Sequence, residues 1–153
     1  MSETKIRRAT IEDISTIVDF NEAMASETEG KILDRSILSS GVKAVFQDPK
    51  NGFYIVCEFE KHVRASLMIT YEWSDWRNGM YLWIQSVFVD KEYRQQGLYT
   101  LMYDYVKTLV DIKSKLVGLR LYVDEENLNA QKVYTSLGMK KSNYHLFEYT
   151  KPK

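Results

Sequence analysis

The feature that most constrains the fold of this chain is a change in the spacing of apolar residues in the middle of its sequence. Aromatic and β-branched residues first gather in three short runs, at positions 53–59, 63–71 and 80–89, which is the pattern of strands. From Leu98 to Val110 the apolar residues recur at intervals of three and four, which is typical of an amphipathic helix. The sequence therefore predicts a meander of three antiparallel strands that leads into a helix.

Weaker patterns on both sides of this segment complete the predicted fold. Two helices are expected before the meander, one after the capping residue Thr10 and one after Asp34. The remaining predicted elements are strands at 5–9, 117–123 and 144–149, a helix at 128–137 that ends at Gly138, and a polar-aromatic loop at 73–79. The predicted order is β-α-α-β-β-β-α-β-α-β. It describes a mixed α/β fold with one central, mostly antiparallel sheet flanked by helices, in which a parallel crossover forms the second half.

Composition limits the class of protein. The length of 153 residues fits one domain, residues 1–153, and no Pro/Gly/Ser-rich linker divides it. The 21 Lys and Arg balance the 21 Asp and Glu, which argues against nucleic-acid or membrane partners held by bulk charge. One cysteine excludes a disulfide framework, and no apolar run has the length of a membrane span. The two histidines lack metal-ligand spacing, so we expect no metal. Taken together, these features lead us to expect a cytoplasmic protein.

An anion site is predicted where the last strand of the meander turns into the long helix. The connecting segment contains Arg94-Gln95-Gln96-Gly97-Leu98-Tyr99. A strand that turns directly into a helix leaves backbone N–H groups of the first turn without partners, and Gly97 allows a phosphate to approach them. A glycine at this position can equally relieve crowding between helix and sheet. Neither a Walker Gly-Lys-Ser/Thr nor a GxGxxG fingerprint is present.

A second motif gives this loop a family context. After the strand at 117–123 come Asn127, Ala130, Tyr134 and then Leu137-Gly138-Met139. This order resembles the second signature of the GNAT superfamily of N-acetyltransferases, and the loop resembles its first signature, Arg/Gln-x-x-Gly-x-Gly/Ala. Their separation and the order of elements also match, so the resemblance covers essentially the whole chain.

Two residues of the loop depart from the family pattern. Gln95 stands where many members have Gly, and it fits there if its backbone avoids positive φ. Tyr99 stands where members have Gly or Ala, so its ring either turns outward or alters the path of the cofactor.

The resemblance implies acetyl-CoA as the acyl donor, bound in a split between the fourth and fifth strands. The backbones of Val87 and Val89 are expected to pair with the pantetheine arm, and an amide near Val87–Phe88 is expected to polarise the thioester carbonyl. Asn127 is expected to contact the pantetheine arm. The full set of expected cofactor-binding residues is Val87, Phe88, Val89, Arg94, Gln95, Gln96, Gly97, Leu98, Tyr99, Asn127 and Ala130.

The resemblance also assigns catalytic roles. Tyr134 matches the tyrosine that stands beside the departing sulfur in many members, where a phenol can act as general acid. An attacking amine must lose a proton, and Glu72 or Glu29 is the expected base, acting through water or, for Glu29, contacting the substrate. Residues 25–29 are expected to be part of the loop that connects the first two helices and borders the acceptor site. The expected acceptor site combines acidic and aromatic side chains that favour a cationic amine. Its members are Glu27, Tyr71, Trp73, Asp75, Trp76 and Gln85.

The expected function is transfer of an acetyl group from acetyl-CoA to a primary amine by direct attack in a ternary complex. The acceptor is a polyamine, an amino-acid-like compound or a protein N-terminus, and a homodimer is one option for assembly. The alternative within the same fold is a non-catalytic acyl-CoA-binding regulatory module. A third alternative is an interaction domain whose aromatic surface binds a protein.

Overall fold

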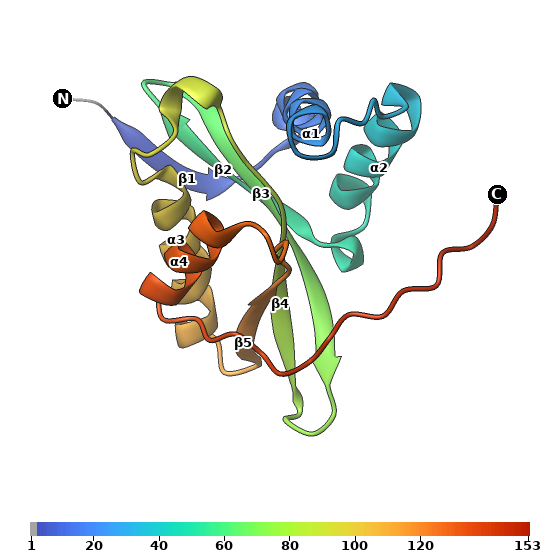
Figure 1. Ribbon diagram of the computed structural model, residues 1–153. Helices are drawn as coiled ribbons and strands as arrows, with labels where there is room; N and C mark the ends of the chain where they lie inside the picture. Colours follow the sequence, from blue (N-terminus) through green and yellow to red (C-terminus); the bar gives the residue numbers. More distant parts are fainter. Residues whose placement is uncertain (1–2) are drawn as a thin grey trace. The chain divides into compact units, whose positions relative to one another are not determined.

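The computed structural model describes residues 3–153, which fall into two compact units (Figure 1). The first, Met1–Tyr122, holds the sheet and is called the sheet unit below. The second, Val123–Lys153, is called the C-terminal unit.

The sheet unit contains one five-stranded sheet whose spatial order follows the sequence, β1-β2-β3-β4-β5. Its strands are β1 (Thr4–Arg8), β2 (Phe53–Phe59), β3 (His62–Ser74), β4 (Gly79–Val89) and β5 (Leu116–Leu121). Neighbouring strands are antiparallel except for β4 and β5, which are parallel. The predicted meander and the parallel crossover are therefore confirmed. The loop predicted at 73–79 starts later than expected, because β3 continues through Trp73 to Ser74.

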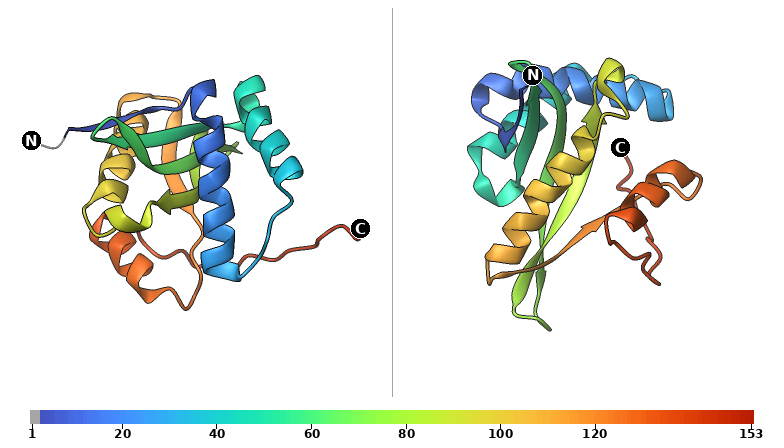
Figure 2. Two further views of the ribbon diagram at one scale, coloured as in Figure 1. Left: turned by 90° about the horizontal axis from the view of Figure 1, so that it is seen from above. Right: turned by 90° about the vertical axis from the view of Figure 1, so that its left-hand side faces the viewer.

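Helices cover both faces of this sheet (Figure 2). On one face lie α1 (Ile14–Glu29) and α2 (Arg35–Gln47), and on the other lies α3 (Leu98–Ile112). Strand alternation divides the core between the two faces. Tyr54 and Val56 of β2 pack with α1 and α2, while Ile55 and Cys57, fully buried, face the opposite way.

The ends of α1 and α2 are fixed by local chemistry. The Asp34 carboxylate accepts hydrogen bonds from the backbone N–H groups of Ser36 and Ile37, as expected for an N-cap. Gly30 ends α1 in the left-handed conformation, with φ of 60°, and its N–H donates to the carbonyl of Ser26. Residues 25–29, expected to be part of the loop between the helices, are instead the last turns of α1.

A nearly buried ion pair holds β1 against the start of α1. The Arg7 guanidinium donates to both Asp13 carboxylate oxygens, at 2.8 and 3.1 Å, and also to Glu58. Asp13 is 7% exposed, and it also accepts a hydrogen bond from the N–H of Thr10 at 2.7 Å. Burial acts to raise the pKa of Asp13, but the hydrogen bonds from Arg7 and Thr10 outweigh it and lower that pKa below its usual value.

The C-terminal unit contains one helix, α4 (Leu128–Ser136), as the sequence predicts. The closing strand predicted at 144–149 was wrong, because residues 139–153 form neither helix nor strand. The side chains of Tyr144, Phe147 and Tyr149 are at least 86% exposed. The alternating pattern expresses only a preference for extended backbone, and a strand also needs a hydrogen-bonded neighbour.

Within residues 3–153, no helix is both long enough and apolar enough to cross a bilayer. The same part of the chain contains no group of three or more His, Cys, Asp or Glu that could hold a metal ion.

We predict that Asp13→Asn destabilises the protein by about 1–3 kcal/mol at neutral pH, because it removes a charge-assisted contact and leaves Arg7 half-paired. Because the pKa of Asp13 is lowered by folding, its contribution is complete above the pKa of an unfolded carboxyl and is lost as pH falls through the folded value. Urea unfolding from pH 7 to pH 3 should show the deficit shrinking with acid.

Arg35→Met is the matched control, because Arg35 pairs with Asp19 and Glu22 on the exposed surface. Its cost should be much smaller, because ion pairs on the exposed surface contribute little to stability. An equal cost for the two variants would contradict the role given to Asp13.

Candidate functional site

Strand β4 extends beyond the region where it pairs with β5, so the last part of one of its edges is open. The last paired residues are Ile84 and Leu121, whereas β4 continues to Val89. Backbone groups of residues 85–89 on this edge therefore have no β5 neighbour. Such an edge can accept an extended ligand as if it were a further strand.

A β-bulge lies at the start of this open edge. Met68 pairs with Gln85 and Ser66 with Phe88, so that Leu67 faces two residues of β4, Ser86 and Val87. Ser86 has φ of 52°, in the left-handed region that costs a non-glycine residue about 1 kcal/mol or more. Bulges often stand beside active sites, where they re-aim the backbone. No sequence signal marked Ser86.

Phe88 is held by the core rather than pointed at a ligand. Its side chain is 8% exposed and its ring centroid lies 4.9 Å from that of Phe20 in α1. Any contribution of Phe88 to ligand binding therefore comes from its backbone. Val87 and Val89 are partly buried.

The loop from Asp90 to Gly97 brings the chain from β4 to the first turn of α3. Gln95 and Gly97 are exposed and have φ of 62° and 79°. Leu98, only 3% exposed, anchors the start of the helix, and no side chain caps this end. The N–H groups of Leu98 and Thr100 have no acceptor within the helix, which makes this end suited to an anion.

The sequence condition for Gln95 is not met. Gln95 fits the family pattern if its backbone avoids positive φ, but it adopts the left-handed conformation, with φ of 62°. The loop therefore contains backbone strain at Gln95, a non-glycine residue with positive φ. A Cβ added at Gly97 meets nothing within 4 Å, so the space beside its backbone is open for a ligand.

Arg94 links this loop to α1. Its Nε donates to the carbonyl of Val89 at 2.8 Å, and its Nη2 lies 2.7 Å from the Glu27 carboxylate. Glu27, predicted to contact the acceptor, is thus engaged with the predicted cofactor loop. Gln96 donates from its side chain to the carbonyl of Glu92.

Tyr99 occupies the first turn of α3. Its side chain is partly buried and its ring lies 6.3 Å from that of Tyr103, one helical turn later. The ring therefore packs along the helix.

Strand geometry separates the side chains predicted to form the acceptor pocket. Glu72 projects from the sheet face that α1 and α2 cover, and Tyr71 and Trp73 project from the opposite face. Asp75 and Trp76 lie in the turn between β3 and β4. That turn is six residues of β4 from Gln85, or about 20 Å at 3.3 Å per residue. The structure therefore separates Glu72 from Tyr71 and Trp73, and the turn that holds Asp75 and Trp76 from Gln85.

Glu72 is held by two donors. Its carboxylate accepts from Trp83 Nε1 at 2.8 Å and from Arg120 Nη1 at 2.9 and 3.0 Å. The hydrogen bonds from Trp83 and Arg120 lower the pKa of Glu72 below its usual value, which makes it a weaker base. These contacts favour a positioning role. Glu29, the other predicted base, lies in the last turn of α1 at 3.7 Å from Lys31.

A cluster that the sequence analysis missed surrounds Glu72. Its other members are Tyr81, Trp83, Arg120 and Tyr122. The period-two spacing of Tyr81, Trp83 and Gln85, and of Arg120 and Tyr122, was the available signal. Gln85 lies on the same face and donates to Thr70 Oγ1 at 2.6 Å.

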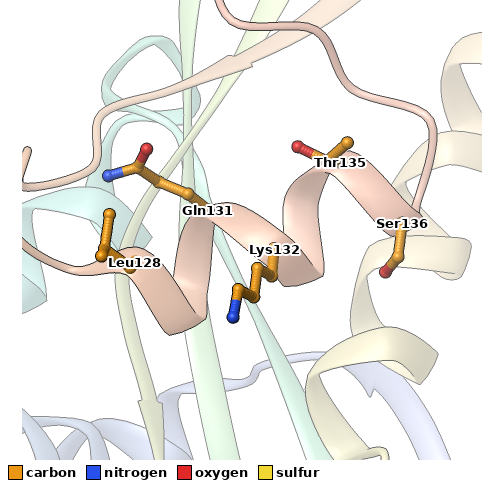
Figure 3. Close-up of a pocket in the computed structure, with 5 residues that line it drawn as sticks. All are labelled: Leu128, Gln131, Lys132, Thr135 and Ser136. Carbon is orange, nitrogen blue, oxygen red and sulfur yellow. The ribbon is translucent and has the colours of Figure 1, made fainter.

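In the C-terminal unit, the second motif builds the start of α4. Asn127 is the N-cap, and its side-chain oxygen accepts from the N–H of Ala130 at 3.1 Å. Tyr134 is partly buried, and burial raises the pKa of its phenol above the usual value. A shallow pocket runs along another part of the same helix (Figure 3). Its lining residues are Leu128, Gln131, Lys132, Thr135 and Ser136.

Comparison with known proteins decides the family. A sequence model described as the acetyltransferase (GNAT) family matches residues 17–139. The chain belongs to the GNAT family. A solved structure described as "a possible acetyltransferase from Clostridium difficile 630" is 47% identical, with a TM-score of 0.92, over 98% of this chain and 99% of that one. Comparison with curated protein sequences gives no match.

More distant solved structures share the fold. The aminoglycoside N-acetyltransferase AAC(6')-Iy in complex with CoA is 12% identical with a TM-score of 0.80, over 99% of this chain and 97% of that one. A transcriptional regulator from Bacillus halodurans C-125 is 19% identical with a TM-score of 0.81, over 97% of this chain and all of that one.

We predict that Gly97→Ala raises the dissociation constant for acetyl-CoA by about tenfold or more, since the new Cβ fills the open space beside the loop backbone. Gly30→Ala is the matched control, because Gly30 also has positive φ and open space around it. Both variants should lose about 1 kcal/mol of stability. Calorimetric titration with acetyl-CoA distinguishes them, and equal affinities would contradict the loop assignment.

Proposed function

We propose that this GNAT protein transfers the acetyl group of acetyl-CoA to a primary amine by direct attack in a ternary complex. The observation that carries the proposal is the open β4 edge, with its bulge at Ser86, followed directly by the exposed first turn of α3. The β4 edge provides an extended surface for a pantetheine arm, and the first turn of α3 provides an anion site for a pyrophosphate.

In this proposal the backbones of Val87 and Val89 bind the pantetheine arm, and an amide near Val87–Phe88 polarises the thioester carbonyl. A donor aimed at the developing oxyanion is a major source of acyl-transfer rate enhancement. The N-terminal end of α3 and the loop that ends at Gly97 bind the pyrophosphate. Arg94 adds a positive charge that Glu27 holds in place.

Tyr134 is proposed as the general acid. The amine nitrogen forms a bond to the carbonyl carbon, the C–S bond breaks, and the departing thiolate takes the phenol proton. Solvent then reprotonates the phenolate. Because burial raises the pKa of Tyr134, the phenol stays protonated at neutral pH and can serve this role.

Deprotonation of the amine is proposed to pass through water to a carboxylate. Of the two carboxylates predicted for this role, Glu72 is engaged by Trp83 and Arg120. Glu29, which lies at the surface 3.7 Å from Lys31, is the better candidate. The family match at 17–139 spans the boundary after Tyr122, which supports the two units acting together as one acetyltransferase domain.

The proposal is tested by measuring thiol release from acetyl-CoA with a panel of primary amines. The panel holds polyamines, amino acids, an aminoglycoside and a peptide with a free N-terminus. We expect release that depends on both acetyl-CoA and an amine. Tight binding of acetyl-CoA without release with any amine would instead favour a non-catalytic regulatory module, a role consistent with the description of the Bacillus halodurans neighbour.

We predict that Tyr134→Phe lowers kcat by about 100-fold while changing acetyl-CoA affinity less than threefold, because the phenol acts only as the sulfur departs. Steady-state kinetics and calorimetry measure the two effects. Tyr105→Phe, a similar change on α3, is the control and should leave both unchanged. An unchanged kcat in Tyr134→Phe would remove the general-acid role.

A further inference from the structure

Arg120 stands beside the open edge of β4, on the face covered by α1 and α2. It pairs with Trp83 in the parallel ladder, one residue before the last pair formed by Ile84 and Leu121. At about 3.3 Å per residue, Arg120 is thus within a few ångströms, along the strand, of the point where β4 and β5 separate. A group bound by Arg120 would lie beside this split, about four residues of β4, or roughly 13 Å, before the place proposed for the thioester.

The Arg120 guanidinium is fixed in position, and part of it is still available. One of its nitrogens, Nη1, contacts both oxygens of Glu72, and its Cζ lies 3.8 Å from the ring centroid of Tyr81. Within residues 3–153 no hydrogen bond is made by Nε or Nη2 of this side chain, which is 34% exposed. These two nitrogens form one edge of the guanidinium, which matches a carboxylate through two parallel hydrogen bonds.

Gly118 of β5 makes room for the Tyr81 ring that supports the Arg120 guanidinium. Gly118 pairs with Tyr81, and a Cβ at Gly118 would lie 2.8 Å from the Tyr81 ring. The missing side chain lets the ring lie flat against β5 and support the Arg120 guanidinium. A substitution here would displace the ring.

The charges of this face favour an anion. The guanidinium of Arg77 lies 5.5 Å from the same Tyr81 ring, so that two guanidinium groups accompany one carboxylate, that of Glu72. Next to them the rings of Trp83 and Tyr122 lie 4.6 Å apart, and Tyr122 is 57% exposed. The surface around Tyr81 therefore combines two guanidinium groups and one carboxylate with exposed aromatic surface.

We propose that Arg120 is a specificity-determining residue that binds a carboxylate of the acceptor, so that the acceptor is an amino-acid-like amine. The inference rests on the proposed function and deepens it. The acceptor carries its amine on the same carbon as its carboxylate or a few carbons away, and its side chain rests on Trp83 and Tyr122. A polyamine or another polycation is disfavoured, because it would bring like charges to Arg77 and Arg120.

The test compares matched pairs of acceptors that differ only in the carboxylate, namely L-phenylalanine with phenethylamine and L-lysine with cadaverine. Thiol release is measured for the unmodified chain and for Arg120→Met. We expect kcat/KM of the unmodified chain to favour the amino acid of at least one pair by about tenfold or more. The decarboxylated analogue would leave the free edge of the Arg120 guanidinium without its carboxylate partner. In Arg120→Met this preference should disappear through a higher KM for the amino acid, while the decarboxylated partner changes less than twofold.

Two further variants separate binding from a structural role. Glu72→Gln keeps the guanidinium and should retain the preference for the amino acid. Arg120→Lys keeps the charge but removes the planar guanidinium, so it should lose most of the preference for the amino acid. If Arg120→Met is unstable, this variant tests carboxylate binding in its place. Acetyl-CoA affinity, measured by calorimetry, should be unchanged in each variant.

Three results would overturn the inference. Equal or faster turnover of the decarboxylated amines by the unmodified chain would exclude carboxylate recognition. A parallel loss for both members of a pair in Arg120→Met would reduce Arg120 to a structural partner of Glu72. If acetyl-CoA binds but no amine releases thiol, the proposed function itself fails and the inference falls with it.

Discussion

The separation of β4 from β5 after Ile84 and Leu121 is the constraint on which the rest of the structure depends. Parallel strands joined by a helical crossover stay paired only as far as their backbones remain adjacent, and here β4 continues while β5 ends. The bulge at Ser86 bends β4 at the point of separation. The open edge then leads directly into the loop before α3, so that one continuous stretch of backbone offers both a strand-like surface and an anion site.

Strain in this stretch is supported by packing on both sides. Ser86 and Gln95 both adopt left-handed conformations that an isolated chain would avoid. Phe88 is held by Phe20, Leu98 is buried at the start of α3, and Arg94 is held by Val89 and Glu27. Such over-determination is what allows strained backbone to persist at functional sites. The same stretch contains Arg94 to Tyr99, the segment that resembles the first signature of the GNAT family, to which this chain belongs.

The sequence predicted the elements well and the side-chain groupings poorly, for a physical reason. Periodicity and caps such as Asp34 act locally, so the meander, the crossover and α4 could be predicted. Strand pairing is not local, so the extended pattern at 144–149 did not form a strand. Glu72 and Tyr71 are adjacent in sequence but project from opposite faces, whereas Arg120 reaches Glu72 from a distant strand. Arg120 and Ser86 were therefore missed.

We propose that residues 85–89 of β4, together with the first turn of α3, bind acetyl-CoA. Hydrogen–deuterium exchange of the backbone amides, with and without acetyl-CoA, tests it most directly. The account predicts slower exchange of the amides of residues 85–89 and 95–100 when acetyl-CoA binds, since these amides become hydrogen-bonded and excluded from water. Binding of acetyl-CoA with unchanged exchange in both segments would contradict it.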